Sequence, residues 1–129
     1  MSMDMYLVTF FRQFDAVVNQ LVEMFPEDQD FKVFRTFLSM LKKTNPTMVI
    51  GTFHEHVVLP FEEKINVRDE TFIMSYTPAN YGSDTIDIIT KIRGYWETLS
   101  PESRDCMWQY IYILKELCKR YYAEGAPKV

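Results

Sequence analysis

The chain has 129 residues and a net charge of −4, and 47% of its residues are hydrophobic, 16% aromatic and 25% charged. This length and apolar content can form one hydrophobic core, so we expect a single domain over residues 1–129 and exclude an intrinsically disordered chain. No apolar run reaches the roughly 20 residues that a membrane span needs, and the first residues lack the basic segment of a secretory signal. We therefore expect a soluble, intracellular protein.

Two helices are predicted in the first third of the chain. Apolar residues spaced three or four apart predict a helix from Asp4 to Phe25, which Pro26 ends. Asp28 or Asp30 can then cap a second helix, because a short acidic side chain accepts hydrogen bonds from the first free backbone N–H groups. The apolar residues of this second helix form a stripe from Phe31 to Leu41.

Prolines indicate the helix boundaries in the middle of the chain. Asn45-Pro46 predicts the start of a third helix, since proline at the first helical position sacrifices no needed donor. We expect this helix to stop at Pro60. Residues 61–74 favour short helical pieces over strands, and the Pro, Asn and Gly content of Tyr76–Gly82 is typical of a structured loop.

Two more helices are predicted before the C-terminus. Ser83 or Asp84 can cap the first of them, and Ser100-Pro101-Glu102 combines a hydroxyl cap, an N-terminal proline and a first-turn acid. The last helix is expected to end near Gly125, which can adopt a left-handed conformation. Helical periodicity with short connections predicts an all-α fold, a compact antiparallel bundle of about five or six helices.

The sequence offers few candidates for catalysis or metal binding. His54 and His56 lie two residues apart and would point about 160–200° apart on a helix, so they would not share a metal ion. The acid pairs Glu62-Glu63 and Asp69-Glu70 could serve acid–base or magnesium chemistry, but adjacent acids more often decorate a solvated helix face. No nucleophile elbow or glycine-rich phosphate loop is present. We expect no catalytic residue, metal or cofactor, and a protein that is not an enzyme.

The two cysteines indicate a reducing environment. Cys106 and Cys118 lie twelve residues apart within one predicted helix, which separates them by roughly 18 Å. A disulfide needs Cα atoms within about 7 Å, so the two thiols cannot pair with each other. Free thiols favour a reducing compartment, although an intermolecular disulfide stays open.

Basic residues fall into two clusters despite the acidic net charge. Residues 31–68 carry six bases against three acids, whereas residues 1–30 carry one base against six acids. If the fold brought the clusters together, they could neutralise phosphates of a nucleic acid. The alternative, which we favour, is ordinary surface bases near helix C-termini. The candidate residues are Lys32, Arg35, Lys42 and Lys43 in the first cluster, and Lys115, Lys119 and Arg120 in the second.

The final helix carries more aromatic residues than one buried stripe requires. Trp108 and Tyr112 form a second stripe that turns away from the main apolar stripe of that helix. A central helix buried on two sides would explain them, and so would exposure at a protein interface, where aromatic residues are enriched. In the second case the interface would also include Tyr76 and Tyr81.

Several short motifs follow one another along the chain: Phe25-Pro26-Glu27-Asp28, Lys43-Thr44-Asn45-Pro46, Val58-Leu59-Pro60-Phe61-Glu62-Glu63-Lys64-Ile65, Arg68-Asp69-Glu70-Thr71-Phe72, Leu99-Ser100-Pro101-Glu102 and Trp108-Gln109-Tyr110. The order and spacing of these motifs resemble those of uncharacterised helical proteins of nucleocytoplasmic large DNA viruses. The resemblance implies a viral origin and a role in the virion or in contact with the host, and brings no catalytic residues with it. Its location would be the host cytoplasm or nucleus, or the interior of the virion.

Our leading hypothesis from the sequence is therefore a non-enzymatic helical interaction or structural protein, such as a virion or accessory component of a large DNA virus. We expect a protein partner or self-association, and no small-molecule substrate. The alternative hypothesis is a nucleic-acid-associated protein that uses the two basic clusters.

Overall fold

The computed structural model describes residues 3–75 and 88–125, and every regular element in these two ranges is helical. The prediction of an all-α bundle is therefore confirmed. The elements are α1 (Met3–Met24), α2 (Gln29–Thr44), α3 (Pro46–Phe53), the π-helical turn η1 (His54–Val58), α4 (Leu59–Asn66), α5 (Thr71–Ser75), α6 (Ile88–Tyr95), the 3₁₀ turn η2 (Trp96–Thr98) and α7 (Pro101–Ala123).

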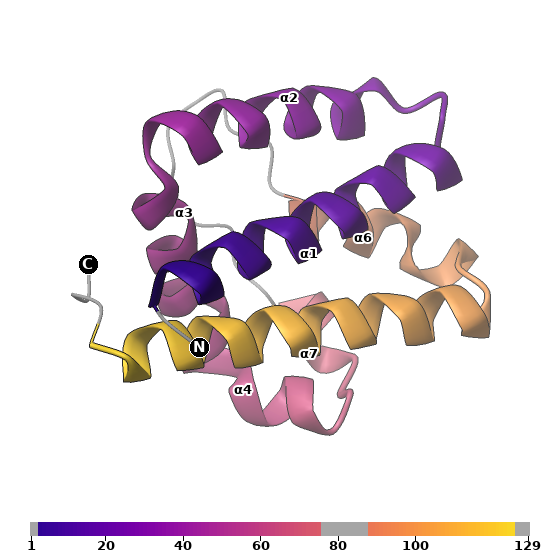
Figure 1. Cartoon of the computed structure of the whole chain (residues 1–129). Helices are drawn as coiled ribbons and strands as arrows, with labels where there is room; N and C mark the ends of the chain where they lie inside the picture. The colour runs from indigo at the N-terminus through magenta and orange to yellow at the C-terminus, as the bar shows by residue number, and fades with distance from the viewer. Residues whose placement is uncertain (1–2, 76–87, 126–129) are drawn as a thin grey trace.

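The bundle is organised around α1 (Figure 1). α7 runs antiparallel along one side of α1, α2 packs along another side, and α3 crosses near the α1 N-terminus. The antiparallel register is visible in the Cys106 thiol, which donates a hydrogen bond to the side-chain oxygen of Gln20 at 3.3 Å. α1 therefore lies between α2 and α7.

Aromatic side chains fill much of the core. Phe10 is fully buried and meets the rings of Phe14 and Phe53 edge-on, with centroids 5.8 and 5.5 Å apart. Burying such a side chain stabilises the fold by roughly 1.5–3 kcal/mol. The aromatic surplus of the sequence is thus largely a property of the core, which the buried residues of α1, α2 and α7 share with the shorter helices.

Two of the predicted helix starts are built as expected. Asp28 is the N-cap of α2 and accepts from the backbone N–H of Asp30 at 3.0 Å, and Ser100 caps α7 by accepting from the N–H of Ser103 at 3.1 Å. α3 begins at Pro46 as predicted, but its N-cap Asn45 makes no side-chain capping bond. Proline at the first helical position is then the remaining local signal for that start.

The expected stop at Pro60 is wrong. α3, η1 and α4 follow one another from residue 46 to residue 66 without a break, and Pro60 is the second residue of α4. In an ordinary α-helix the proline ring collides with the carbonyl four residues earlier. Here a π-helical turn precedes it, in which the N–H of Leu59 donates to the carbonyl of His54, five residues back. The wider turn lets the helix pass the proline.

The remaining helices agree with the sequence where the structure describes them. The expected short helical pieces after residue 60 are present as the end of α4 and as α5, and α7 ends before Gly125, whose φ is +97°. The predicted cap of α6 at Ser83 or Asp84 and the predicted loop Tyr76–Gly82 lie outside the described residues. Within residues 3–75 and 88–125, no helix has the length and apolar character to cross a membrane.

Candidate functional site

Trp108 is a core residue. It is 5% exposed, and its ring lies 5.7 Å from that of Trp96 in η2 and 6.2 Å from that of Phe72 in α5. α7 is therefore buried on two sides, against α1 and against the shorter helices. The interpretation of Trp108 as an exposed interface residue is wrong for this fold, because its ring packs inward against Trp96 and Phe72. Tyr76 and Tyr81 lie outside the described residues.

Tyr112 is 45% exposed, but its ring has an internal partner. The ammonium group of Lys115 lies 4.1 Å from the centre of the ring, within the range of a cation–π interaction. Tyr112 thus covers a buried charge, and no other aromatic residue predicted for the interface is exposed beside it in the described residues.

Lys115 is also not a surface base. Its side chain is 2% exposed, and its ammonium group donates to Asn66 at 2.6 Å and to Glu116 at 2.8 Å. Glu62 lies 3.8 Å away. A buried ammonium group requires such partners, because desolvation of an unpaired charge is costly. Lys115 therefore joins α7 to α4, and its predicted role as a phosphate contact is wrong.

The three bases of the second basic cluster differ in their burial and in their partners. Lys119 forms an ion pair with Glu62 at 2.5 Å, which raises the pKa of Lys119, and Arg120 is exposed. These residues belong to α7, and α1 lies between α7 and α2 (Figure 1). The two basic clusters are therefore on helices that pack against different sides of α1.

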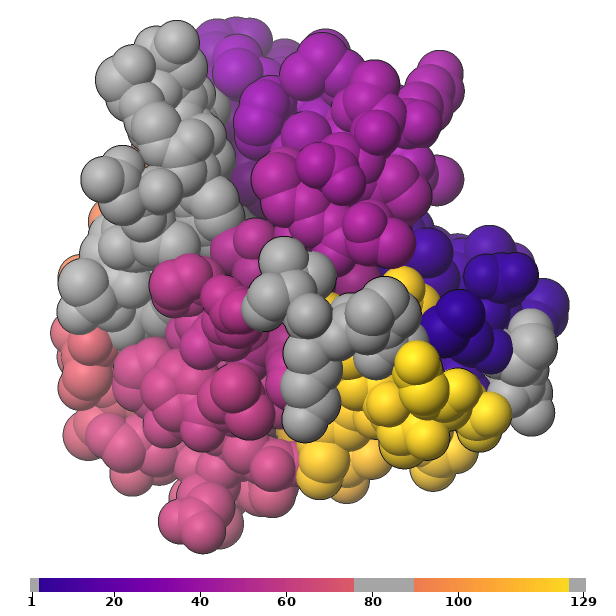
Figure 2. All heavy atoms as spheres, turned by 90° about the vertical axis from the view of Figure 1, so that its left-hand side faces the viewer, coloured from indigo at the N-terminus to yellow at the C-terminus, as the bar shows by residue number. Residues whose placement is uncertain are grey.

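The first basic cluster has a different setting, on the outer face of α2. The apolar stripe of this amphipathic helix packs into the core through Phe31, Phe34 and Leu38. The opposite face of the helix is therefore left to solvent. The purple atoms of α2 accordingly reach the molecular surface in the space-filling view (Figure 2). Five residues of this face line a hollow of about 580 Å³, and we call them the α2 surface: Arg35, Thr36, Ser39, Met40 and Lys43.

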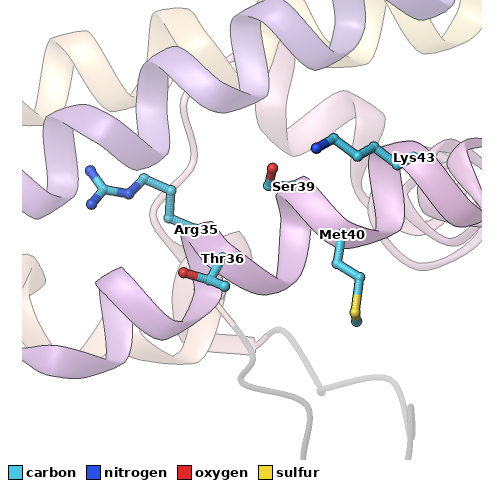
Figure 3. A pocket seen from close by; sticks show the side chains of 5 residues that line it. All are labelled: Arg35, Thr36, Ser39, Met40 and Lys43. Atoms are coloured by element: carbon cyan, nitrogen blue, oxygen red, sulfur yellow. The ribbon is translucent and has the colours of Figure 1, made fainter.

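The side chains of the α2 surface combine cations, hydroxyl groups and one apolar group. Figure 3 shows Arg35, Ser39 and Lys43 extending from one side of the helix and Met40 from the other. Met40 is 50% exposed, although its side chain is large and apolar. This composition can contact an anionic group and an apolar group together.

The cations of α2 are weakly engaged within the protein. Arg35 donates to the side chain of Asn19 at 3.3 Å, and Lys42 pairs with Asp15 at 3.3 Å, both toward α1. The second contact joins two solvated side chains and contributes little to stability. Among the ion pairs of the described residues, none involves Lys32, Arg35 or Lys43. These cations are available to an external anion.

A second polar network joins α6 to the start of α2. Lys91 pairs with Asp28 at 2.8 Å and with Asp30 at 3.0 Å, and the hydroxyl of Tyr95 donates to Asp28 at 2.5 Å. Hydrogen bonds from Lys91 and Tyr95 lower the pKa of Asp28 to about 2, and the same contacts raise the pKa of Lys91 and of Tyr95. The ring of Tyr95 stacks on Phe25 at 4.0 Å. The groups bind one another, so we interpret this network as structural.

The candidate metal and acid–base residues do not converge. His54 is buried with its ring 4.4 Å from that of Tyr122, whereas His56 is exposed. Asp69 accepts from the backbone N–H and the hydroxyl of Thr71 at the start of α5, and Glu70 accepts from the indole of Trp96 at 3.0 Å. In the part of the chain that the structure describes, no three His, Cys, Asp or Glu residues are grouped as metal ligands.

The α2 surface is thus the feature of the described residues that best fits an external ligand. The sequence pointed to its cations, but it gave no signal for the hollow or for the exposure of Met40. In comparisons with known proteins, no family model, no curated protein and no solved structure matches the chain.

Proposed function

We propose that this protein is a non-enzymatic helical interaction protein that binds an anionic partner through the α2 surface. The observation that carries the proposal is a hollow flanked by Arg35 and Lys43, two cations without an ion pair among the described residues, on a chain with a net charge of −4. A local positive field on an acidic protein directs an anionic partner to one face.

The resemblance to proteins of nucleocytoplasmic large DNA viruses supports a more specific proposal. We propose that the chain is a virion or accessory component that acts inside the host cell or the particle. Its two cysteines are free, as expected in a reducing compartment. The proposal concerns the setting of the protein and does not depend on the identity of the partner.

A second candidate function is association with nucleic acid. Its specific support is the run from Phe31 to Thr44, which contains four bases and no acid. Phosphate contacts by these bases would produce an affinity that falls steeply with salt. Lys115 is lost to this candidate because it is buried and paired within the fold, and Lys119 is paired with Glu62.

Charge reversal on α2 tests the proposed function. We would measure by fluorescence anisotropy the binding of labelled polyglutamate, and separately of a short DNA duplex, at low and physiological salt. Lys43→Glu should weaken polyglutamate binding roughly tenfold, because it replaces attraction by repulsion at the hollow, a change of about 1.4 kcal/mol. Arg120→Glu is the matched control, since it alters the net charge equally on an exposed site of α7.

The two probes separate the candidates. Binding of polyglutamate that Lys43→Glu weakens and Arg120→Glu leaves within about twofold supports the α2 surface. Binding of the duplex alone, with the same dependence on Lys43, would favour nucleic acid. Equal effects of the two variants, or no binding of either polyanion at low salt, would refute the proposed function.

A further inference from the structure

We infer that the α2 surface takes an acidic segment of a partner protein, in which one apolar side chain is flanked by two carboxylates about 12 Å apart. This inference rests on the proposed function and specifies its partner. The first observation is the size of the hollow, about 580 Å³. The described residues that line it all belong to α2, so the hollow is open to solvent and can contact a docked segment along its length.

The second observation is the spacing of the cations. Arg35 and Lys43 lie eight residues apart on one continuous helix, which places their Cα atoms about 12 Å apart along its axis. The hydroxyl-bearing residues Thr36 and Ser39 lie between them. Two carboxylates at a similar spacing could therefore each meet a cation and leave room for a hydrogen bond to a hydroxyl group.

The third observation is the position of Met40. Along the helix axis it lies between Arg35 and Lys43, and half of its side chain is exposed. A methionine side chain is flexible and adapts to differently shaped apolar groups. Met40 lines the same hollow as the two cations but extends from the other side of α2 (Figure 3). An apolar residue of the partner that reached across the hollow toward that side would bury Met40, which a purely electrostatic contact would leave in water.

These features favour a protein segment over a nucleic acid. A phosphate backbone makes polar contacts and gains little from an exposed thioether. The net charge of −4 opposes a duplex, which carries one phosphate charge for about every 1.7 Å of its axis, whereas a short segment with two carboxylates meets mainly the local field of α2. Asp15, which pairs with Lys42 at the α1 edge, would further repel a chain of phosphates that extended in that direction.

A pair of designed peptides tests the inference. The first is a helical peptide of about 16 residues with Glu at positions i and i+8 and Leu at i+4, which puts the three side chains on one face about 12 Å long. The control peptide has the same composition with the second Glu moved to i+6, on another face. We expect the full-length protein to bind the first peptide at least fivefold more tightly than the control.

Variants of the protein complete the design. Met40→Gln should weaken the Leu peptide about fivefold and leave unchanged the binding of a version with Ala at i+4, whereas Lys43→Glu should weaken both. Met40 is half exposed, so the substitution should leave the fold intact, as circular dichroism and the thermal midpoint can verify. Val33→Gln, at another exposed apolar position of α2, is the matched control.

The outcomes distinguish the inference from the proposed function. If the two peptides bind equally and Met40→Gln has no effect, while Lys43→Glu still removes polyglutamate binding, the inference is wrong and the proposed function stands. If a DNA duplex binds more tightly than the first peptide and independently of Met40, the partner is a nucleic acid. If polyglutamate and both peptides fail to bind at low salt, both proposals are wrong.

Discussion

Asp28 combines a local contact with long-range ones. It caps α2, and its carboxylate accepts from Lys91 and Tyr95 of α6, more than 60 residues away in sequence. The cap was predictable, because a short acid before an amphipathic stretch is a local signal. The contacts with α6 were not predictable, since they depend on how the chain returns to the start of α2.

The lowered pKa of Asp28 predicts a specific acid sensitivity. The pKa is about 2 in the folded protein against a usual value of 3.8, so the carboxylate stabilises the fold above pH 4, and this contribution is lost as the pH falls toward 2. Asp28→Asn keeps a capping acceptor but removes the charge. We expect the difference between wild type and variant in the free energy of unfolding, measured with urea, to shrink from pH 5 to pH 2.5.

The neighbouring acid provides the control for this prediction. Asp30 also contacts Lys91, but its side chain is 53% exposed, so Asp30→Asn should have a smaller effect at every pH. A difference between wild type and Asp28→Asn that stays constant from pH 5 to pH 2.5 would contradict the role of the ionised carboxylate.

The burial of Lys115 could not be predicted from the sequence. In the sequence it belongs to a basic cluster with Lys119 and Arg120, yet it is the most deeply buried charged residue of the described chain. Its hydrogen-bond partner Asn66 lies 49 residues away on α4, and no local sequence pattern predicts this hydrogen bond. The spacing of three from Tyr112 is the one local hint, because residues at this spacing are neighbours on a helix.

Among the helices, those with local start signals could be predicted. Asp28, Asn45-Pro46 and Ser100-Pro101 each precede an observed helix, because caps and N-terminal prolines act within one turn. Continuation through Pro60 could not be predicted. It requires a π-helical turn, whose five-residue hydrogen bond is rare and has no dependable sequence pattern.

The two aromatic residues of the second α7 stripe should respond differently to truncation. Trp108→Ala removes a buried ring that packs on Trp96, and should lower the free energy of unfolding by about 3–5 kcal/mol. Tyr112→Ala removes a half-exposed ring over Lys115, and should cost about 1 kcal/mol. Urea denaturation followed by circular dichroism would measure both. Wild-type stability of Trp108→Ala would show that the ring is not part of the core.

For the whole molecule, the distribution of charge matters more than its sum. On this acidic chain, Lys32, Arg35 and Lys43 of α2 form no ion pair with the described residues, and α1 lies between that helix and the second basic cluster (Figure 1). The sequence showed the two clusters, but whether they meet depends on long-range packing and could not be predicted. The fold reduces the candidate nucleic-acid surface to one helix and presents an exposed methionine beside its cations.

The most direct measurement of the central claim is a chemical-shift titration of the isotopically labelled protein with polyglutamate. We predict that the amide signals that move most belong to residues 32–43, and that Lys43→Glu abolishes these shifts while the spectrum of the remaining core is retained. Shifts centred on α7, or spread evenly over the surface, would contradict the assignment of the binding surface to α2.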